Sequence, residues 1–366
     1  MSTLFGIWNT IQYKLFPWLE EELDPLTEKE QKFVQVVSLL DLENHLRDYR
    51  WKGMGRKKKD RMCMAKAFVA KSAYNFETTD ILIEYLKGCK NLRRLCGWEH
   101  KRQVPSRSTF SRSFTEFSNG QLAQKIHEAM VKKHCASKLA GHVSRDSTAI
   151  EAREKPAKKK SNNIDLQQKR KRGRPRKDEF VPPKPLKRLD LQPNKSLEEN
   201  LNELPDHCDV GTKQNSKGHK SSWVGYKLHL DCIDGDIPVS AVLTSASLHD
   251  SQAAIPLAQM TSQRITSLYD LMDSAYDAPQ IKSFSQKLGH VPIIDHNPRR
   301  SGEKIQMDPA TKVRFAERSS AERVNSNLKD NYGGRNIRVK GPQKVMAHLM
   351  FGVIAITATQ MFRLLL

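Results

Sequence analysis

Three acidic residues stand far apart in the chain, and each lies in a short motif of small and polar residues. They are Asp146 in SRDSTAIEAR, Asp273 in LMDSAYD and Glu322 in SSAERVNSNLK. Two-metal phosphodiester cleavage needs carboxylates from distant positions, because hard cations about 3.5 to 4 Å apart require shared oxygen ligands. A single acid is more often a surface charge than a metal ligand, so the surrounding residues must distinguish the two roles.

The residues around Glu322 form a helical pattern. At about 100° per residue, Phe315, Arg318, Glu322 and Lys329 fall on one helix face within about 60°. That face carries an aromatic ring, two cations and the acid. An ordinary solvated stripe with intrahelical ion pairs shows the same pattern.

The elements that must position the acids are predicted by hydrophobic periodicity. Alternation over 223–232 indicates a half-buried strand, Asp234-Gly235 is typical of a hairpin turn, and alternation over 237–243 continues on a returning strand. The remaining predicted elements are a first strand at 143–146, a helix at 250–264, a strand at 268–272, a helix to 288, a strand at 291–294, a helix with Glu322 and a C-terminal helix.

This order predicts an α/β fold with a ribonuclease-H-like mixed sheet over residues 139–366. Asp146 and Asp273 occupy strand positions at which such a sheet presents side chains at its edge.

Residues 1–138 are predicted to form an all-helical N-terminal DNA-binding domain. Thr27 and Glu30 make a capping-box pattern, and further helices are expected at 59–73, at 78–87 and after Pro105. The last helix carries Arg107 and Arg112 among phenylalanines. It is either a DNA-recognition helix of a helix-turn-helix or a plain amphipathic helix, and the sequence leaves both open.

The C-terminal segment 345–362 is apolar enough to suggest a membrane span. His348, Thr357 and Gln360 interrupt it, so a buried helix is the favoured interpretation.

Composition points to a polyanionic partner. Lys and Arg number 62 against 41 Asp and Glu, for a formal charge of +21, and the isoelectric point is near 9.7. Nucleic acid is the leading candidate for such a balance. The six cysteines form no CxxC pair and no secretory signal begins the chain, which predicts a reduced, cytoplasmic protein.

Residues 156–206 are rich in Lys, Arg, Pro, Asn and Gln, which predicts a disordered or loosely held insert. Within it, KRKRGRPRK at 169–177 resembles an AT-hook. Gly173 and Pro175 allow an extended path, and Arg172 and Arg174 can enter an A·T-rich minor groove. A solvated basic linker is the alternative.

The spacing F-x(2)-R-x(3)-E-x(6)-K resembles the Y-R-E-K signature of bacterial insertion-sequence DDE transposases. The motifs around Asp146 and Asp273 resemble that family's first and second acid motifs. The resemblance implies that Asp146, Asp273 and Glu322 are catalytic and bind Mg²⁺, with Mn²⁺ as the possible substitute, and that Arg318 and Lys329 grip phosphates of a transposon end.

The chain departs from the family in two places. Phe315 replaces the usual Tyr, so a packing or stacking group is expected there. Glu322 follows Asp273 by only 49 residues, which leaves no room for a large strand-rich insertion and puts hairpin-forming chemistry in doubt. A pair like His249-Asp250 often follows the third strand in this family. Asp250 either lies near the active site or caps the next helix, and the cap is favoured.

The implied function is that of a transposase that binds insertion-sequence ends, cleaves DNA and joins 3′-hydroxyl ends to target DNA. The implied partners are double-stranded DNA, as terminal inverted repeats and target, and a second copy of the chain, because joining two ends needs at least a homodimer in the synaptic complex. No membrane is involved, and a nucleoid-associated location is expected. The alternative is a noncatalytic A·T-rich DNA-binding protein derived from a transposase.

Overall fold

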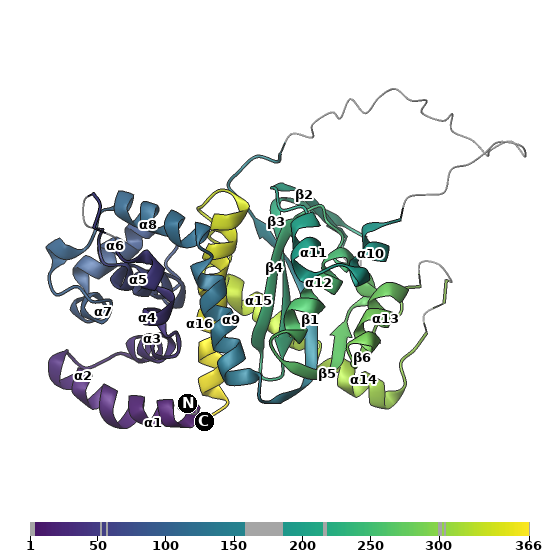
Figure 1. Cartoon of the computed structure of the whole chain (residues 1–366), viewed down its shortest axis with the longest axis horizontal. Coiled ribbons are helices and arrows are strands. Elements are labelled where there is room, and N and C mark those ends of the chain that lie inside the picture. Colours follow the sequence, from purple (N-terminus) through teal and green to yellow (C-terminus); the bar gives the residue numbers. More distant parts are fainter. Residues whose placement is uncertain are drawn as a thin grey trace, which may run out of the picture.

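The computed structural model describes most of the chain, namely residues 4–51, 53–55, 58–157, 186–214, 218–298, 302–303 and 305–365. A helical part and a sheet-containing part lie side by side, and the C-terminal helix α16 (Pro342–Arg363) stands between them (Figure 1).

Six strands build one mixed sheet in the second part. Its order is β2-β3-β1-β5-β6, and β4 also pairs with β3. β1 runs antiparallel to β3 and parallel to β5. The strands are β1 (Leu139–Glu151), β2 (Asp209–Gln214), β3 (Lys220–Ile233), β4 (Ile237–Ser245), β5 (Thr266–Met272) and β6 (Val291–Ile294). The element order and the mixed pairing confirm the predicted ribonuclease-H-like α/β fold.

The two faces of the sheet are covered by different helices. Thr261 of α12 (Ser251–Ser262) donates to Asp231 of β3 on one face, whereas Ala321 of α15 (Ser319–Asn331) donates its N–H to Ser144 of β1 on the other. α13 (Pro279–Lys287) packs on α12 and β6. Every residue of β4 is therefore buried, and so is the second half of β3. The prediction of a half-buried strand over 223–232 is wrong, because sequence alternation does not show that a polar face is also covered.

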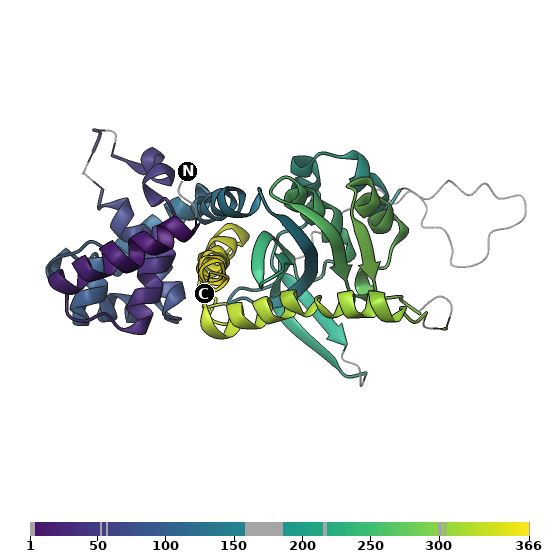
Figure 2. The ribbon, with the colours of Figure 1, turned by 90° about the horizontal axis from the view of Figure 1, so that it is seen from below.

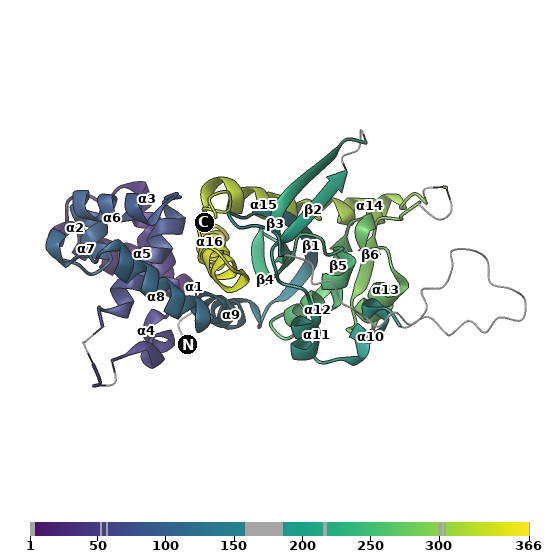
Figure 3. The same ribbon diagram turned by 90° about the horizontal axis from the view of Figure 1, so that it is seen from above.

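The predicted hairpin turn between β3 and β4 is confirmed. Gly235 and Asp236 both have positive φ, 81° and 58°. Glycine takes this conformation without strain, which explains the Asp234-Gly235 pair at the turn. The N-terminal half of β3 and its partner β2 extend beyond the rest of the sheet (Figure 3).

The first part of the chain is helical, as predicted. The capping box is present at the start of α3, where Thr27 N–H donates to Glu30 Oε2 at 2.8 Å and Glu30 N–H donates to Thr27 Oγ1 at 3.3 Å. The elements are α1 (Leu4–Thr10), η1 (Ile11–Leu15), α2 (Phe16–Glu22), α3 (Glu28–Leu39), α4 (Leu42–His45), η2 (Arg47–Tyr49), α5 (Arg61–Ala73), α6 (Thr79–Gly88), α7 (Lys90–Leu95), η3 (Lys101–Gln103), α8 (Arg107–Asn119) and α9 (Leu122–Cys135).

Helix α16 is buried between the two parts. It is long and apolar enough to cross a membrane by composition, but 83% of its apolar window is buried inside the protein. Phe351 contacts Phe68 of α5 and Phe114 of α8, while Thr357 contacts the Pro238 carbonyl of β4. The favoured interpretation of a buried helix is therefore confirmed, and α16 places the helices and the sheet in one continuous core.

The end of the basic insert is folded. Three short helices, α10 (Arg188–Leu191), η4 (Gln192–Asn194) and α11 (Leu197–Glu203), lie against α12. Gln192 donates to the Gln252 carbonyl at 2.7 Å, and Asn200 donates to Gln259 at 2.9 Å. The prediction of a loosely held insert is thus wrong for 186–206, because these amide hydrogen bonds add to apolar contacts that its few leucines make with α12.

One buried ion pair ties the central strands together. Arg145 of β1 and Asp231 of β3 form two hydrogen bonds of 2.7 and 2.8 Å, and their side chains are 3% and 0% exposed. Thr261 satisfies a further lone pair of Asp231 at 2.7 Å. Since Arg145 precedes Asp146, this pair fixes the backbone that carries the first acid.

We expect Arg145→Met to lower the free energy of unfolding by about 3 to 5 kcal/mol, because it leaves the Asp231 carboxylate buried without its cation. The double variant Arg145→Met/Asp231→Leu should recover much of this loss, since no unpaired charge remains. Urea unfolding followed by circular dichroism measures both. A double variant as unstable as the single one would contradict the argument.

Candidate active site

Asp146 and Asp273 are brought together by the parallel pairing of β1 and β5. Arg145 lies opposite Met272 in that ladder, so the next residue of each strand is the acid. Neighbouring strands are about 4.8 Å apart, and residues in register on parallel strands point to the same face. The two carboxylates are therefore neighbours although they are distant in sequence.

Asp146 lies on the sheet face that α15 covers. Asn325 of α15 donates its amide N–H to Asp146 Oδ2 at 3.0 Å. Burial raises the pKa of Asp146 to about 6, and the negative charges of Asp273 and Glu322 act in the same direction. A backbone hydrogen bond from Ser147 and the charge of Arg318 act in the opposite direction, but they do not outweigh burial and the two acids.

Asp273 follows the last residue of β5 and caps the short helix η5 (Ser274–Tyr276). Its Oδ1 accepts the Ala275 N–H at 2.9 Å. Burial raises the pKa of Asp273, this hydrogen bond lowers it, and the negative charge of Asp250 raises it. Neither Asp273 nor Asp146 forms an ion pair with a lysine or arginine of the described residues.

Glu322 lies at the rim of this pair. Its side chain is 52% exposed and forms an ion pair of 2.7 Å with Arg318. It precedes Asn325 by three residues on α15, so the two share a helix face, and its charge contributes to the raised pKa of Asp146. Within the described ranges, no three His, Cys, Asp or Glu side chains are grouped closely enough to hold a metal ion.

The helix around Glu322 is interrupted. α14 (Pro309–Ala316) ends before Arg318, and α15 begins at Ser319, so the prediction of one continuous stripe is wrong. The two helices are nonetheless nearly in line (Figure 2). The Arg318 guanidinium lies 5.5 Å from the centre of the Phe315 ring, which keeps aromatic, cation and acid adjacent and makes Phe315 a stacking group.

Ser144 explains why the interruption lies where it does. Its hydroxyl donates to the Arg318 carbonyl and accepts the Ala321 N–H at 3.3 Å. A carbonyl that binds a strand side chain is not available to the next turn of its own helix. Neither Ser144 nor Asn325 was expected from sequence, although S-x-D places Ser144 on the strand face of Asp146, and E-x-x-N places Asn325 on the helix face of Glu322.

Lys329 lies two turns beyond Glu322 on α15, about 10 Å along the helix axis. It is half-buried, and burial lowers its pKa, as do the neighbouring charges of Arg335 and Lys213. Three cations therefore gather where α15 passes β2, and an anion bound there would relieve their repulsion.

Asp250 is a further acid near the pair. It occupies the N-cap position of α12, but its side chain caps no N–H there, so the favoured cap interpretation is wrong. Its Oδ1 instead accepts from Lys227 Nζ at 2.9 Å. Burial works against ionisation, but His229 and Lys227 hold the pKa of Asp250 below its ordinary value, so this acid is charged beside Asp273.

The predicted DNA-binding arginines of α8 lie on the surface. Arg107 is exposed and pairs with Asp80 at 3.0 Å, while Arg112 is exposed and binds only its own helix, at the Ser108 carbonyl. The phenylalanines of α8 are buried. This arrangement is compatible with both interpretations of the helix. The AT-hook-like residues Arg172, Gly173, Arg174 and Pro175 lie outside the described residues.

The residues present fit a divalent cation. Asp146 and Asp273 offer oxygen donors that Mg²⁺ and Mn²⁺ prefer, and both have raised pKa values that a bound cation would lower. Glu322 could add a third carboxylate only after leaving Arg318. The donor set is thus the two aspartates, with Glu322 as a third carboxylate that is paired with Arg318 in this structure.

Two family models match the chain. Residues 203–358 match the transposase DDE domain, which includes Asp273 and Glu322, and residues 21–116 match the transposase domain DUF772. Asp146 lies between the two matched ranges. No curated protein and no solved structure matches the chain.

We expect Asp146→Asn to stabilise the protein in the absence of divalent cations at neutral pH, but not in acid. The folded-state pKa of about 6 exceeds the unfolded value of about 3.9. The folded state therefore binds the proton more tightly, and stability falls as pH rises between these values. The gain above pH 6 should be at most about 3 kcal/mol and should vanish near pH 4.

Urea unfolding in the presence of EDTA, near pH 4 and near pH 7.5, measures this difference. Mg²⁺ should then raise the stability of the wild type more than that of the variant. An equal effect of the substitution on stability at both pH values would show that the pKa of Asp146 is not raised in the folded state.

Proposed function

We propose, on the premise that both matched parts of the chain are transposase domains, that this transposase binds the ends of an insertion sequence, cleaves DNA and joins the 3′-hydroxyl ends to target DNA. Membership of the Y-R-E-K group, a homodimer in the synaptic complex and a nucleoid-associated, cytoplasmic location are parts of the same proposal. Asp146, Asp273 and Glu322 are its catalytic carboxylates.

The side-by-side placement of Asp146 and Asp273 is the observation that carries this proposal. The two carboxylates are half-buried and both have raised pKa values, and the charge of Asp273 acts on Asp146. A fold without a use for a cation at this position gains nothing from that repulsion. Bound Mg²⁺ or Mn²⁺ supplies a polarised phosphate and an activated water or 3′-hydroxyl for in-line attack.

The chain's own residues position the carboxylates. Asn325 and the Ser147 backbone hold the Asp146 carboxylate, and the Ala275 N–H holds one oxygen of Asp273, so both carboxylates are fixed in position for a cation. Arg318 holds Glu322 in the absence of DNA. A DNA phosphate competes for the Arg318 guanidinium, because charge-assisted bonds to phosphate are strong and bidentate. Glu322 then becomes available to the pair.

Asp146→Asn, Asp273→Asn and Glu322→Gln should each reduce cutting and strand transfer by at least about a hundredfold while end binding persists. Each substitution removes the charge of a ligand but little volume. Cleavage and joining of labelled duplexes that carry the inverted repeats flanking the coding sequence measure activity with Mg²⁺ or Mn²⁺, and a mobility shift without metal measures binding.

Glu317→Gln is the matched control, since Glu317 is an exposed acid next to Arg318 that precedes the site helix. It should cut like the wild type. Metal-dependent strand transfer retained in one of the three variants would remove that residue from the site. A wild type that binds ends but never cuts them would favour the noncatalytic A·T-rich DNA-binding alternative.

A second part of the proposal concerns Arg172 and Arg174. Replacing both with Ala should lower affinity for A·T-rich duplexes more than for G·C-rich ones, because narrow A·T minor grooves attract arginine. The slope of log affinity against log salt should fall by about two units, at roughly 0.9 for each lost phosphate contact. Salt titrations on matched duplexes measure both effects. Equal losses on the two duplexes would indicate only a basic linker.

A further inference from the structure

A cleft of about 470 Å³ lies where the helical part meets the end of β1 and the start of α16. α5, α6 and α8 form one side of it. The segment that follows β1 and the segment that leads into α16 form the other, and these two segments are joined by the Gly341 N–H, which donates to Glu154 Oε1 at 3.2 Å. Six cations line the cleft: Lys71, Arg107, Arg153, Arg338, Lys340 and Lys344.

The acids of this cleft are too few to balance its cations. Glu77 and Asp80 are the acidic lining residues. Asp80 pairs with Arg107 at 3.0 Å, and Glu77 is at 3.9 Å from Arg338. Lys71 is buried, and its ammonium finds only the Glu77 backbone carbonyl at 3.5 Å. Burial lowers the pKa of Lys71 to about 8, and the charge of Arg338 acts in the same direction.

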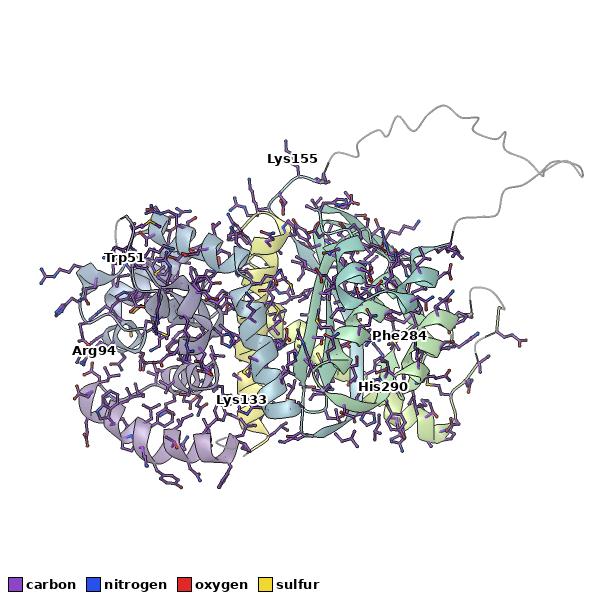
Figure 4. All side chains as sticks on the ribbon, viewed as in Figure 1. Trp51, Arg94, Lys133, Lys155, Phe284 and His290 are labelled. Carbon is purple, nitrogen blue, oxygen red and sulfur yellow. The ribbon has the colours of Figure 1, made fainter. Side chains whose placement is uncertain are left out.

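The other three cations lack partners. Within the described part of the chain, Arg153, Lys340 and Lys344 form no ion pair. Glu154, the acid next to Arg153, is engaged by the Gly341 N–H. Figure 4 shows Lys155 projecting from the same segment, above the start of α16. Cations placed close together without counter-charges cost free energy. This arrangement therefore indicates that an anion binds here when the protein functions.

The position of the cleft favours an extended polyanion over a small one. Its cations come from both parts of the chain, and Arg153 follows Asp146 by seven residues of nearly continuous strand, about 20 Å. This distance equals roughly six base-pair steps of duplex DNA. A single duplex can therefore contact the cleft and the acid pair.

We propose that this junction cleft binds consecutive phosphates of the duplex that the acid pair cuts, and so fixes the distance between the bound segment and the cut. The proposal rests on the proposed function only in naming DNA as the anion. Arg107, which pairs with Asp80 at the helical side of the cleft, then contacts the backbone rather than base edges.

The triple variant Arg153→Gln/Lys340→Gln/Lys344→Gln tests the cleft with little risk to folding, because the three side chains are exposed or half-buried. The probe is a fluorescein-labelled duplex of mixed sequence, titrated at several salt concentrations in EDTA. The slope of log affinity against log salt should fall by about 2.7 units, at roughly 0.9 per phosphate contact.

The matched control is Lys29→Gln/Lys32→Gln/Lys287→Gln, which removes the same charge from exposed lysines of α3 and α13, far from the cleft. Its slope should stay within about half a unit of the wild type, because Lys29, Lys32 and Lys287 make no phosphate contact in the proposal. An unchanged slope in the cleft variant, or an equal fall in the control, would overturn the inference.

A second measurement uses the wild-type protein and needs no variant. Acetylation of lysines, followed by mass spectrometry, should show Lys340 and Lys344 protected by the duplex while Lys29 and Lys287 react as in free protein. Equal reactivity of Lys340 and Lys344 with and without DNA would contradict the proposal. Since both measurements omit metal, a failure of cutting refutes the proposed function alone, whereas cutting with no cleft effect refutes the cleft alone.

Discussion

The repulsion between Asp146 and Asp273 is the constraint on which the rest of the structure depends. Two neighbouring carboxylates, both partly removed from water, destabilise the fold that holds them. Burial is the largest cause of the raised pKa of each, and the charge of Asp273 adds to it at Asp146, as the charge of Asp250 does at Asp273. The sheet prevents them from separating. β3 and β5 pair with β1 on its two edges, so β1 cannot shift Asp146 away from Asp273 without losing one ladder.

Two sets of contacts offset this repulsion: an ion pair on the opposite face of the sheet and the packing of α16. Arg145 and Asp231 lock β1 to β3 on the opposite face, with Nε and Nη2 of the guanidinium each donating to one oxygen of the carboxylate. α16 buries nearly its whole surface between the helices and the sheet. Phe351 of α16 packs on α5 and α8, while Thr357 contacts β4. α16 therefore connects the helical part to the sheet as one element. On the proposed function, DNA bound to the helices would lie at a defined distance from the acids.

Periodicity alone predicted β3 to β6 with most of their bounds, since these strands alternate or run apolar between clear turn residues. It predicted only the middle of β1 and missed β2. It placed Asp146 and Asp273 at strand positions, but only the pairing of β1 with β5 shows that they are neighbours. It could not show that helices cover both sheet faces, because the polar alternation of β3 is used internally, by Lys227, His229 and Asp231. Composition misjudged 186–206, whose amides bind α12. The break before Ser319 depends on Ser144, a contact between residues 174 positions apart that local pattern cannot contain.

The same break sets what Glu322 can do. Ser144 holds the Arg318 carbonyl, so the Arg318 backbone is fixed. The guanidinium can therefore bind only groups that its side chain reaches from this backbone position. Those partners are the Phe315 face and the Glu322 carboxylate. Phe315 gives a cation–π contact that survives when a phosphate arrives, whereas the exposed ion pair with Glu322 is weak and easily exchanged. Glu322 shares a helix face with Asn325, which already contacts Asp146. On the proposed function, a DNA phosphate that replaces Glu322 at Arg318 releases Glu322 to complete the carboxylate set, which links the third carboxylate to the presence of DNA.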